Sequence, residues 1–361
     1  MIMGKWFLLF LVLMALFFAA LGLYTNLYFD NESLKAQVID FLPPLPKIDE
    51  MKAVYLTVNT ALGQKSMDKI VELVKSSELN SVVIDIKDAE KDYLNKDMKR
   101  VIKRLRFADI FPVARLPAFQ HDGLAKAHPQ LALKKADGAL WRDSGGRFWL
   151  DPASQEVWQI ILDEARQAAK MGFGEINLDY IRFPSDGKLS SVIYPVWDKK
   201  ISRSEIIKNF SQFMKDGLKQ EYPDVKLTAD VFGYLLLRDD DQGIGQSITE
   251  LAKIFDFVYP MVYPSHYDSG NFNFDNPATH PYEIVFQSLE KGKKIFEKHQ
   301  QSFVNVRPWI QDFDLGAIYT PEMVRLQMKA TEDAGLKQGW LVWNPNNRYR
   351  QEIFALDKKI Q

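Results

Sequence analysis

The chain has 361 residues, with 46 Lys and Arg against 47 Asp and Glu, and it contains no cysteine. The balanced charge argues against nucleic acid as the main partner, because phosphate binding requires a basic surface. The lack of cysteine excludes disulfides, thiol catalysis, iron–sulfur clusters and cysteine zinc sites, and 47% hydrophobic residues indicate a folded protein.

An apolar segment opens the chain. Residues 6–29 carry no charge, and a helix of that length would span about 30 Å of hydrocarbon. One lysine precedes the segment and two acidic residues follow it, so the positive-inside rule places the remainder of the chain outside the cytoplasm. A cleaved signal peptide is the competing interpretation. We therefore expect residues 1–29 to be a membrane anchor or signal segment and residues 30–51 to form a Pro-containing tether.

From residue 52 to about residue 355, short β-branched or aromatic runs alternate with segments of helical period. The predicted strands are 53–58, 81–86, 110–116, 175–181, 226–232, 257–263, 303–309 and 339–344. The predicted helices are 66–77, 96–109, 154–172, 202–220, 246–255, 282–299 and 320–335, with Ser66, Ser154 and Thr320 as N-caps. Eight such units predict an α/β fold of the (β/α)8 TIM-barrel class behind one transmembrane helix. An open doubly wound sheet is the alternative, although no glycine-rich phosphate turn follows the first strand.

The longest gap between predicted strands, residues 117–173, is read as an insertion after the third strand. It holds a predicted helix and a glycine-rich loop with three aromatic residues, Trp141, Phe148 and Trp149. Either hydrophobic contacts pin this loop to the barrel, or at least one ring stacks on a sugar at the barrel mouth.

Polar and aromatic residues follow nearly every predicted strand at its carboxyl end, where a barrel carries its active site. Amides, carboxylates and guanidinium groups bind hydroxyls, and Trp and Tyr rings stack on sugar faces, so the set predicts a carbohydrate ligand. The candidate substrate-binding residues are Asp85, Asp88, Arg115, Arg182, Tyr263, His266, Trp309, Asp312, Trp343, Asn344 and Asn346.

Two aspartates in otherwise apolar strands are the candidate catalytic residues. Asp179 stands in EINLDYI and Asp230 in KLTADVF, and burial of a carboxylate is costly unless a partner compensates. Arg115 and Arg182 are the candidate partners. Two carboxylates at adjacent strand ends meet the requirement of glycoside hydrolysis, in which one donates a proton and the other attacks or activates water. A buried Asp–Arg pair that only braces the barrel is the structural alternative.

Metal and serine-nucleophile chemistry have little support in the sequence. The five histidines form no H-x-H or H-E-x-x-H pair, and G-x-S-x-G is absent. The acidic run 239–241 is either a calcium ligand set or a solvated loop. We expect no metal and no cofactor.

Seven strings in fixed order carry a family resemblance: VVIDIKD (82–88), LDYIRFPSDG (178–187), TADVFGY (228–234), DDDQGIGQ (239–246), PMVYPSHY (260–267), VRPWIQDF (306–313) and LVWNPNNRY (341–349). With them, the chain resembles a bacterial family of glycoside hydrolase domains, which is similar to TIM-barrel glycosidases including the α-amylase-like group. The resemblance implies Asp179 as the nucleophile. It places Asp230 at the acid/base position, where that group has a glutamate.

The sequence thus predicts a membrane-anchored, extracytoplasmic barrel that hydrolyses a polysaccharide or a cell-envelope glycan. A catalytically silent carbohydrate-binding barrel and a transglycosylase are the alternatives. Neither nucleic acid nor a cofactor is expected as a partner.

Overall fold

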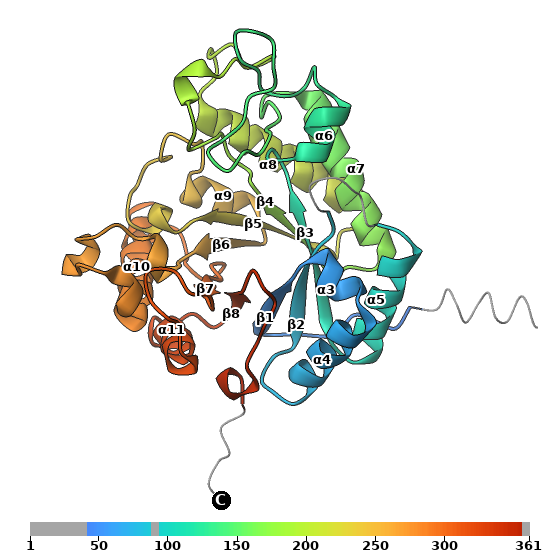
Figure 1. The fold of residues 1–361 in the computed structure, drawn as a ribbon, viewed down its shortest axis with the longest axis vertical. Helices are drawn as coiled ribbons and strands as arrows, with labels where there is room; N and C mark the ends of the chain where they lie inside the picture. The colour runs from blue at the N-terminus through green and yellow to red at the C-terminus, as the bar shows by residue number, and fades with distance from the viewer. Residues whose placement is uncertain (1–41, 88–93, 356–361) are drawn as a thin grey trace, which may run out of the picture. The chain divides into compact units, whose positions relative to one another are not determined.

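The computed structural model describes residues 42–87 and 94–355 (Figure 1). The chain divides into two compact units, Met1–Pro43 and Pro44–Gln361, and the second unit is the one treated below. The expected anchor or signal segment and the candidate residue Asp88 lie outside the described residues. Within the described ranges, no helix is both long and apolar enough to cross a membrane.

Eight parallel strands close into a barrel in chain order, and β8 pairs with β1 to complete the ring. The strands are β1 (Met51–Leu56), β2 (Ser81–Asp85), β3 (Phe111–Pro117), β4 (Glu175–Asp179), β5 (Lys226–Phe232), β6 (Phe257–Met261), β7 (Trp309–Gln311) and β8 (Gly339–Trp343). This closure confirms the predicted (β/α)8 barrel and rules out the open doubly wound sheet.

Helices connect the strands and surround the barrel (Figure 1). They are α3 (Val58–Leu62), α4 (Gln64–Lys75), α5 (Lys96–Phe107), α6 (Asp122–Ala127), α7 (Gln155–Met171), α8 (Arg203–Glu221), α9 (Ile248–Ile254), α10 (Pro281–Lys298) and α11 (Pro321–Asp333). Short 3-10 turns lie at η1 (Leu189–Ser191), η2 (Gly233–Leu236), η3 (Pro264–His266), η4 (Asn271–Asn273), η5 (Pro277–Thr279) and η6 (Gln351–Ile353).

Capping residues set several helix ends as the sequence predicts. Ser154 caps α7, which ends at Gly172 in the left-handed conformation. Thr320 caps α11 in the same way. The prediction that Ser66 caps a helix is wrong, because the chain already turns at Gly63 and α4 begins there. The Ser66 hydroxyl lies inside the helix and donates to the carbonyl of Gly63 at 2.8 Å.

The seventh strand differs from its predicted range of 303–309. It comprises Trp309–Gln311 and begins directly after Pro308. Proline has no N–H to donate to a sheet ladder, and residues before it reach β6 only through an isolated bridge between Val258 and Val306. The prediction of 303–309 therefore shares only Trp309 with the observed strand, because the proline determines where regular pairing starts.

A buried ion pair braces the interior of the barrel. Glu175 accepts hydrogen bonds from the hydroxyls of Thr228, at 2.9 Å, and Tyr259. Arg307 donates to the same Tyr259 oxygen at 2.5 Å, and its Nη1 lies 3.7 Å from Glu175 Oε2. Burial raises the pKa of Glu175, and the Arg307 charge opposes that rise. A buried Glu–Arg pair therefore braces the barrel in addition to the buried pair between Arg115 and Asp179.

Arg307→Met is expected to lower the free energy of unfolding by about 3–5 kcal/mol, because it leaves the Glu175 carboxylate buried without its cation. Urea denaturation measures the change. The double variant E175Q/R307M should recover part of the loss, and Lys329→Met, which breaks the exposed Lys329–Asp333 pair on α11, is the matched control with little effect. Equal stability of R307M and the control contradicts the bracing role.

The aromatic residues of the insertion face inward. Trp141 and Trp149 are each 1% exposed, and Phe148 is also buried. Trp149 Nε1 donates to Asp143 Oδ2 at 2.8 Å, and Trp141 Nε1 donates to the carbonyl of Lys188 at 3.3 Å. These contacts support the interpretation in which the rings pin the loop, and they leave no open ring face for sugar stacking.

Candidate active site

Arg115, on β3, binds three carboxylates near the carboxyl ends of neighbouring strands. Its Nη1 donates to Asp85 Oδ1 at 2.6 Å, its Nη2 donates to Asp179 Oδ2, and its Nε donates to Asp230 Oδ2 at 3.4 Å. The sheet register explains the grouping, because Asp85 pairs with Arg115, and Arg115 pairs with Asn177 two residues before Asp179. One buried guanidinium therefore gathers acidic residues from β2, β4 and β5.

Asp179 is held on both carboxylate oxygens. Oδ2 accepts from Arg115, and Oδ1 accepts from the backbone N–H of Tyr180 at 2.5 Å. Tyr180 has a φ of 54°, a left-handed conformation that is uncommon for residues other than glycine and that clusters at functional sites. The chain thus turns sharply after β4 and fixes the Asp179 carboxylate at the barrel mouth.

Asp230 lies at the same level on β5, because Leu178 pairs with Ala229 one residue earlier. Its Oδ1 accepts from Trp309 Nε1 at 2.7 Å and from Asn177 Nδ2 at 3.0 Å. Burial and the nearby Asp179 carboxylate raise the pKa of Asp230 to about 8, which favours its protonated form. The side chain is nevertheless 2% exposed.

Asp85 is the third carboxylate of the cluster. Its Oδ2 accepts from the Tyr55 hydroxyl at 2.5 Å. Burial raises the pKa of Asp85, and the charge of Arg115 opposes the rise. Trp343 stacks on Tyr55 with ring centroids 3.8 Å apart and lies 5.0 Å from the Arg115 guanidinium carbon. Sequence reasoning does not identify Tyr55, because it resembles an ordinary core residue of β1 and shares the inward face of that strand with Ala53.

Two cavities open at the carboxyl ends of the strands, and Tyr180 lines both. The aromatic cavity, of about 330 Å³, lies at the ends of β4, β5 and β6, and its walls include Asp179, Arg182, Phe232, Tyr234, Tyr263 and His266. The polar cavity, of about 430 Å³, lies at the ends of β1, β2, β3 and β8, and its walls include Asn59, Asp85, Lys87, Arg115, Gln120 and Trp343. Asp230 and Trp309 line neither cavity.

Tyr263 and His266 lie in the aromatic cavity, as expected from the sequence. Their rings contact edge to face with centroids 5.2 Å apart. Burial lowers the pKa of His266 below its usual 6.5, so the imidazole is neutral at pH 7. The ring can exchange hydrogen bonds with a sugar hydroxyl without adding charge to the cavity.

Arg182 also reaches the aromatic cavity, but it forms no hydrogen bond to Asp179. Its Nη1 donates to the Phe183 carbonyl and to Ser185 Oγ, both at 3.1 Å. The partner expected for Asp179 is thus Arg115 alone.

Asp312 and Asn344 lie outside these cavities and form hydrogen bonds with the segment that follows β8. Asp312 accepts from Arg350 at 3.1 Å and from Asn344 at 3.4 Å, and Asn344 donates to the carbonyl of Arg348 at 3.0 Å. Burial raises the pKa of Asp312 to about 6. These contacts hold the segment after β8, and neither residue lines the aromatic or the polar cavity.

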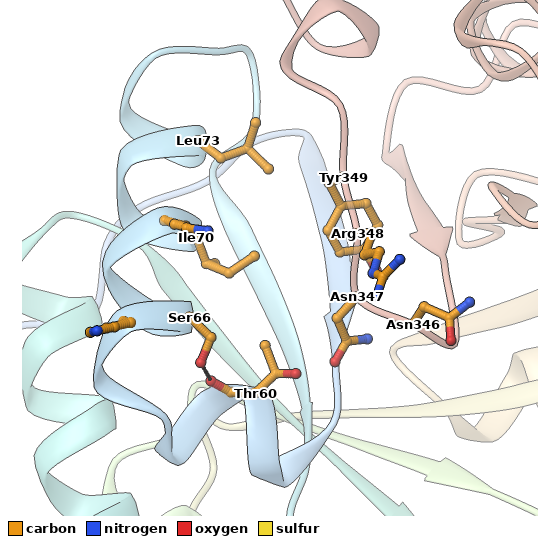
Figure 2. A pocket seen from close by; sticks show the side chains of 10 residues that line it. Thr60, Ser66, Ile70, Leu73, Asn346, Asn347, Arg348 and Tyr349 are labelled. Atoms are coloured by element: carbon orange, nitrogen blue, oxygen red, sulfur yellow. Dashed lines mark hydrogen bonds between the residues drawn. The ribbon is translucent and has the colours of Figure 1, made fainter.

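Asn346 lines a third cavity, of about 480 Å³, between α4 and the loop after β8. Figure 2 shows Asn346, Asn347, Arg348 and Tyr349 on that loop, across from Ser66 and Ile70 of α4, with Asn346 farthest from the helix. Asn346 lines neither the aromatic nor the polar cavity. It follows the end of β8 at Trp343 by three residues, so periodicity along the strand could not reveal its position.

Residues 53–349 match the family model described as "Putative glycosyl hydrolase domain". The chain belongs to this family. This match confirms the family resemblance carried by the seven sequence strings, and Arg115 with its three carboxylates lies inside the matched range. No curated protein matches the sequence.

Solved structures of glycosidases share the fold. The α-galactosidase TtGalA from Thermus thermophilus, in complex with stachyose, matches with a TM-score of 0.53 and 15% identity over 87% of this chain and 66% of that chain. The α-L-fucosidase isoenzyme 2 from Paenibacillus thiaminolyticus matches with a TM-score of 0.54 and 10% identity, over 85% of this chain and 48% of that chain. A hypothetical protein from Ruminiclostridium thermocellum has 28% identity and a TM-score of 0.44, over 53% of this chain and 99% of that chain. The chain therefore spans 66% of one glycosidase and 48% of the other.

Proposed function

We propose that this glycosyl hydrolase domain cleaves a polysaccharide or cell-envelope glycan at the Arg115 cluster. The observation that carries the proposal is one guanidinium bound to two carboxylates, Asp85 and Asp179, each of which lines a cavity at the barrel mouth. A glycan chain that passes Tyr180 would place sugars in both cavities and a glycosidic bond beside the cluster.

Asp179 is the proposed nucleophile, or the base that activates water in an inverting reaction. Its two hydrogen bonds orient the carboxylate, and it lines the aromatic cavity. In the retaining form of the reaction, a carboxylate oxygen bonds to the anomeric carbon while the leaving oxygen takes a proton, and water then releases the sugar.

Two residues are candidates for the proton donor. The sequence predicts Asp230, and its raised pKa suits an acid. A donor must, however, reach the leaving oxygen by a hydrogen bond or through one water, and Asp230 is enclosed by Trp309, Asn177 and Arg115. Asp85 combines a raised pKa with a position on the polar cavity. We therefore assign the proton transfer to Asp85 and give Asp230 a positioning role toward Arg115.

Incubation of the full-length chain with a panel of neutral, acidic and N-acetylated glycans tests the function, with released sugars measured by chromatography. Release of sugars by the wild type and not by Asp179→Asn supports hydrolysis at this site. Products longer than the substrate identify a transglycosylase. Binding without any product from the wild type identifies a carbohydrate-binding barrel and contradicts the proposal.

We further propose that the barrel acts outside the cytoplasm, held at the membrane by residues 1–29. The uncharged run 6–29 and the acidic residues after it support this orientation. Protease added to intact bacterial spheroplasts that express the full-length chain should digest the barrel, and alkaline washing should leave the chain in the membrane fraction. A mature N-terminus beyond residue 29 indicates signal cleavage instead, and a barrel protected from protease contradicts export.

A further inference from the structure

We propose that Arg182 forms an anion subsite in the aromatic cavity and that the glycan presents a sugar carboxylate there, as hexuronic acids do. This inference rests on the proposed function, because it names the class of substrate for the same cleft. It starts from the Arg182 guanidinium, which no carboxylate of the described residues contacts directly, although Asp179, Asp186 and Asp143 act on its charge from farther away.

Three arginines are buried in the described structure, and Arg182 differs from the other two. Arg115 lies within salt-bridge distance of three aspartates, and Arg307 lies 3.7 Å from Glu175. Arg182 is 7% exposed, and in the described parts of the chain its hydrogen bonds go only to the Phe183 carbonyl and to Ser185 Oγ, with no carboxylate oxygen within 4.0 Å. A buried charge without a counterion is costly, so the site is built at a cost that an anionic ligand would offset.

Aromatic rings hold the Arg182 guanidinium in place. Its central carbon lies 4.7 Å from the centroid of Phe232, 4.8 Å from that of Trp149 and 5.5 Å from that of Tyr180. Cation–π contacts of this kind stabilise a desolvated guanidinium in part. Trp149 is itself fixed by its hydrogen bond to Asp143. The cation is therefore held rigidly at the wall of the cavity rather than on a mobile side chain.

The free edge of the guanidinium matches a carboxylate. Nη1 is occupied by the Phe183 carbonyl and Ser185 Oγ, whereas Nε and Nη2 donate to no acceptor in the described residues. Neither of these two nitrogens is among the enclosed unpaired atoms, so both keep contact with open space. Adjacent N–H groups in one plane form the two-donor fork that binds carboxylates.

The other charge in the aromatic cavity does not compete for this role. Asp179 already has Arg115 as its cation, and His266 is neutral because burial lowers its pKa. The remaining walls named above are aromatic, and they suit the apolar face of a sugar ring. An acidic sugar therefore finds, in the same cavity, a stacking surface and a guanidinium that no carboxylate of the described residues contacts directly.

Binding of matched glycans to the full-length Asp179→Asn protein tests the subsite without requiring turnover. The probes are oligogalacturonate and glucuronoxylan fragments with native carboxyls, and the same fragments after their carboxyls are reduced to primary alcohols. We expect at least one native probe to bind about tenfold or more tightly than its reduced form. Titration calorimetry measures the dissociation constants, and the preference should fall at high salt.

Variants then locate the preference. Arg182→Gln should abolish it, and Arg182→Lys should retain part of it through charge alone. Arg142→Gln is the matched control, because Arg142 also stacks on a ring, Phe148 at 4.2 Å, but is exposed and lines neither mouth cavity. Thermal denaturation checks that each variant is folded. If R182Q does not fold, the subsite is tested by comparing the binding of native and reduced probes to the Arg182-containing protein and to R182K.

Equal binding of native and reduced probes, or a preference that survives in R182Q, overturns the subsite. That failure is distinct from failure of the proposed function. Hydrolysis of neutral glycans that requires Asp179 would leave the glycosidase standing without an acid preference. An Arg182-dependent preference in a protein that releases no sugar would leave the subsite standing without catalysis.

Discussion

Asp179→Asn is expected to lower kcat by about 10³-fold or more while leaving the fold and glycan binding intact. Asparagine has nearly the shape of aspartate, and its carbonyl oxygen can still accept from the Tyr180 N–H. The amide cannot bond to the anomeric carbon as a carboxylate does, and it gives Arg115 one anionic partner fewer. Initial rates on the glycan that the wild type cleaves measure the effect.

Two controls separate chemistry from structure. Asp224→Asn removes an exposed carboxylate on the loop between α8 and β5 and should leave kcat unchanged. Formate or azide added to Asp179→Gly should restore part of the rate if Asp179 is a nucleophile, since a small anion can enter the space left by the side chain. A D179N enzyme that keeps more than about a tenth of wild-type kcat would falsify the assignment, because loss of a nucleophile costs far more.

The main elements of the barrel could be predicted because local and global signals agree. The period of the apolar residues located seven of the eight strands, and residues such as Ser154 and Gly172 marked helix ends through their own backbone chemistry. The exceptions have local causes. Pro308 has no N–H to donate, so β7 begins only after it, and the N-cap of α4 is Gly63 rather than Ser66.

The active site could be predicted only in part, because strand alternation gives the face of a residue and not its access to solvent. Asp179 and Asp230 both point into the barrel at one level, and their sequence contexts are similar. They differ in access to the cavities because Trp309, which is 79 residues after Asp230, donates to Asp230 Oδ1 across the barrel. No local signal encodes that contact. The pairing of Arg115 with Asp179, by contrast, follows from the need of a buried carboxylate for a cation.

Asp85→Asn and Asp230→Asn are expected to affect different parts of the reaction. A proton donor matters most when the leaving group is poor, and its loss costs about 10²–10⁴-fold. With Asp85 as donor, D85N should show that loss on natural glycans and a much smaller one on 2,4-dinitrophenyl glycosides of the same sugar. D230N should lose similar activity on both substrates, because a displaced Arg115 disturbs the site whatever the leaving group.

The pH dependence decides between the two aspartates. A donor must be protonated, so kcat/KM falls as the pH rises through the pKa of the free enzyme's acid. Burial raises the pKa of Asp85, and it raises that of Asp230 to about 8, so either donor produces a fall on the alkaline side. The fall should disappear in D85N and persist in D230N. Its disappearance in D230N alone would return the acid role to Asp230 and require an opening past Trp309, because a proton donor needs a path to the leaving oxygen.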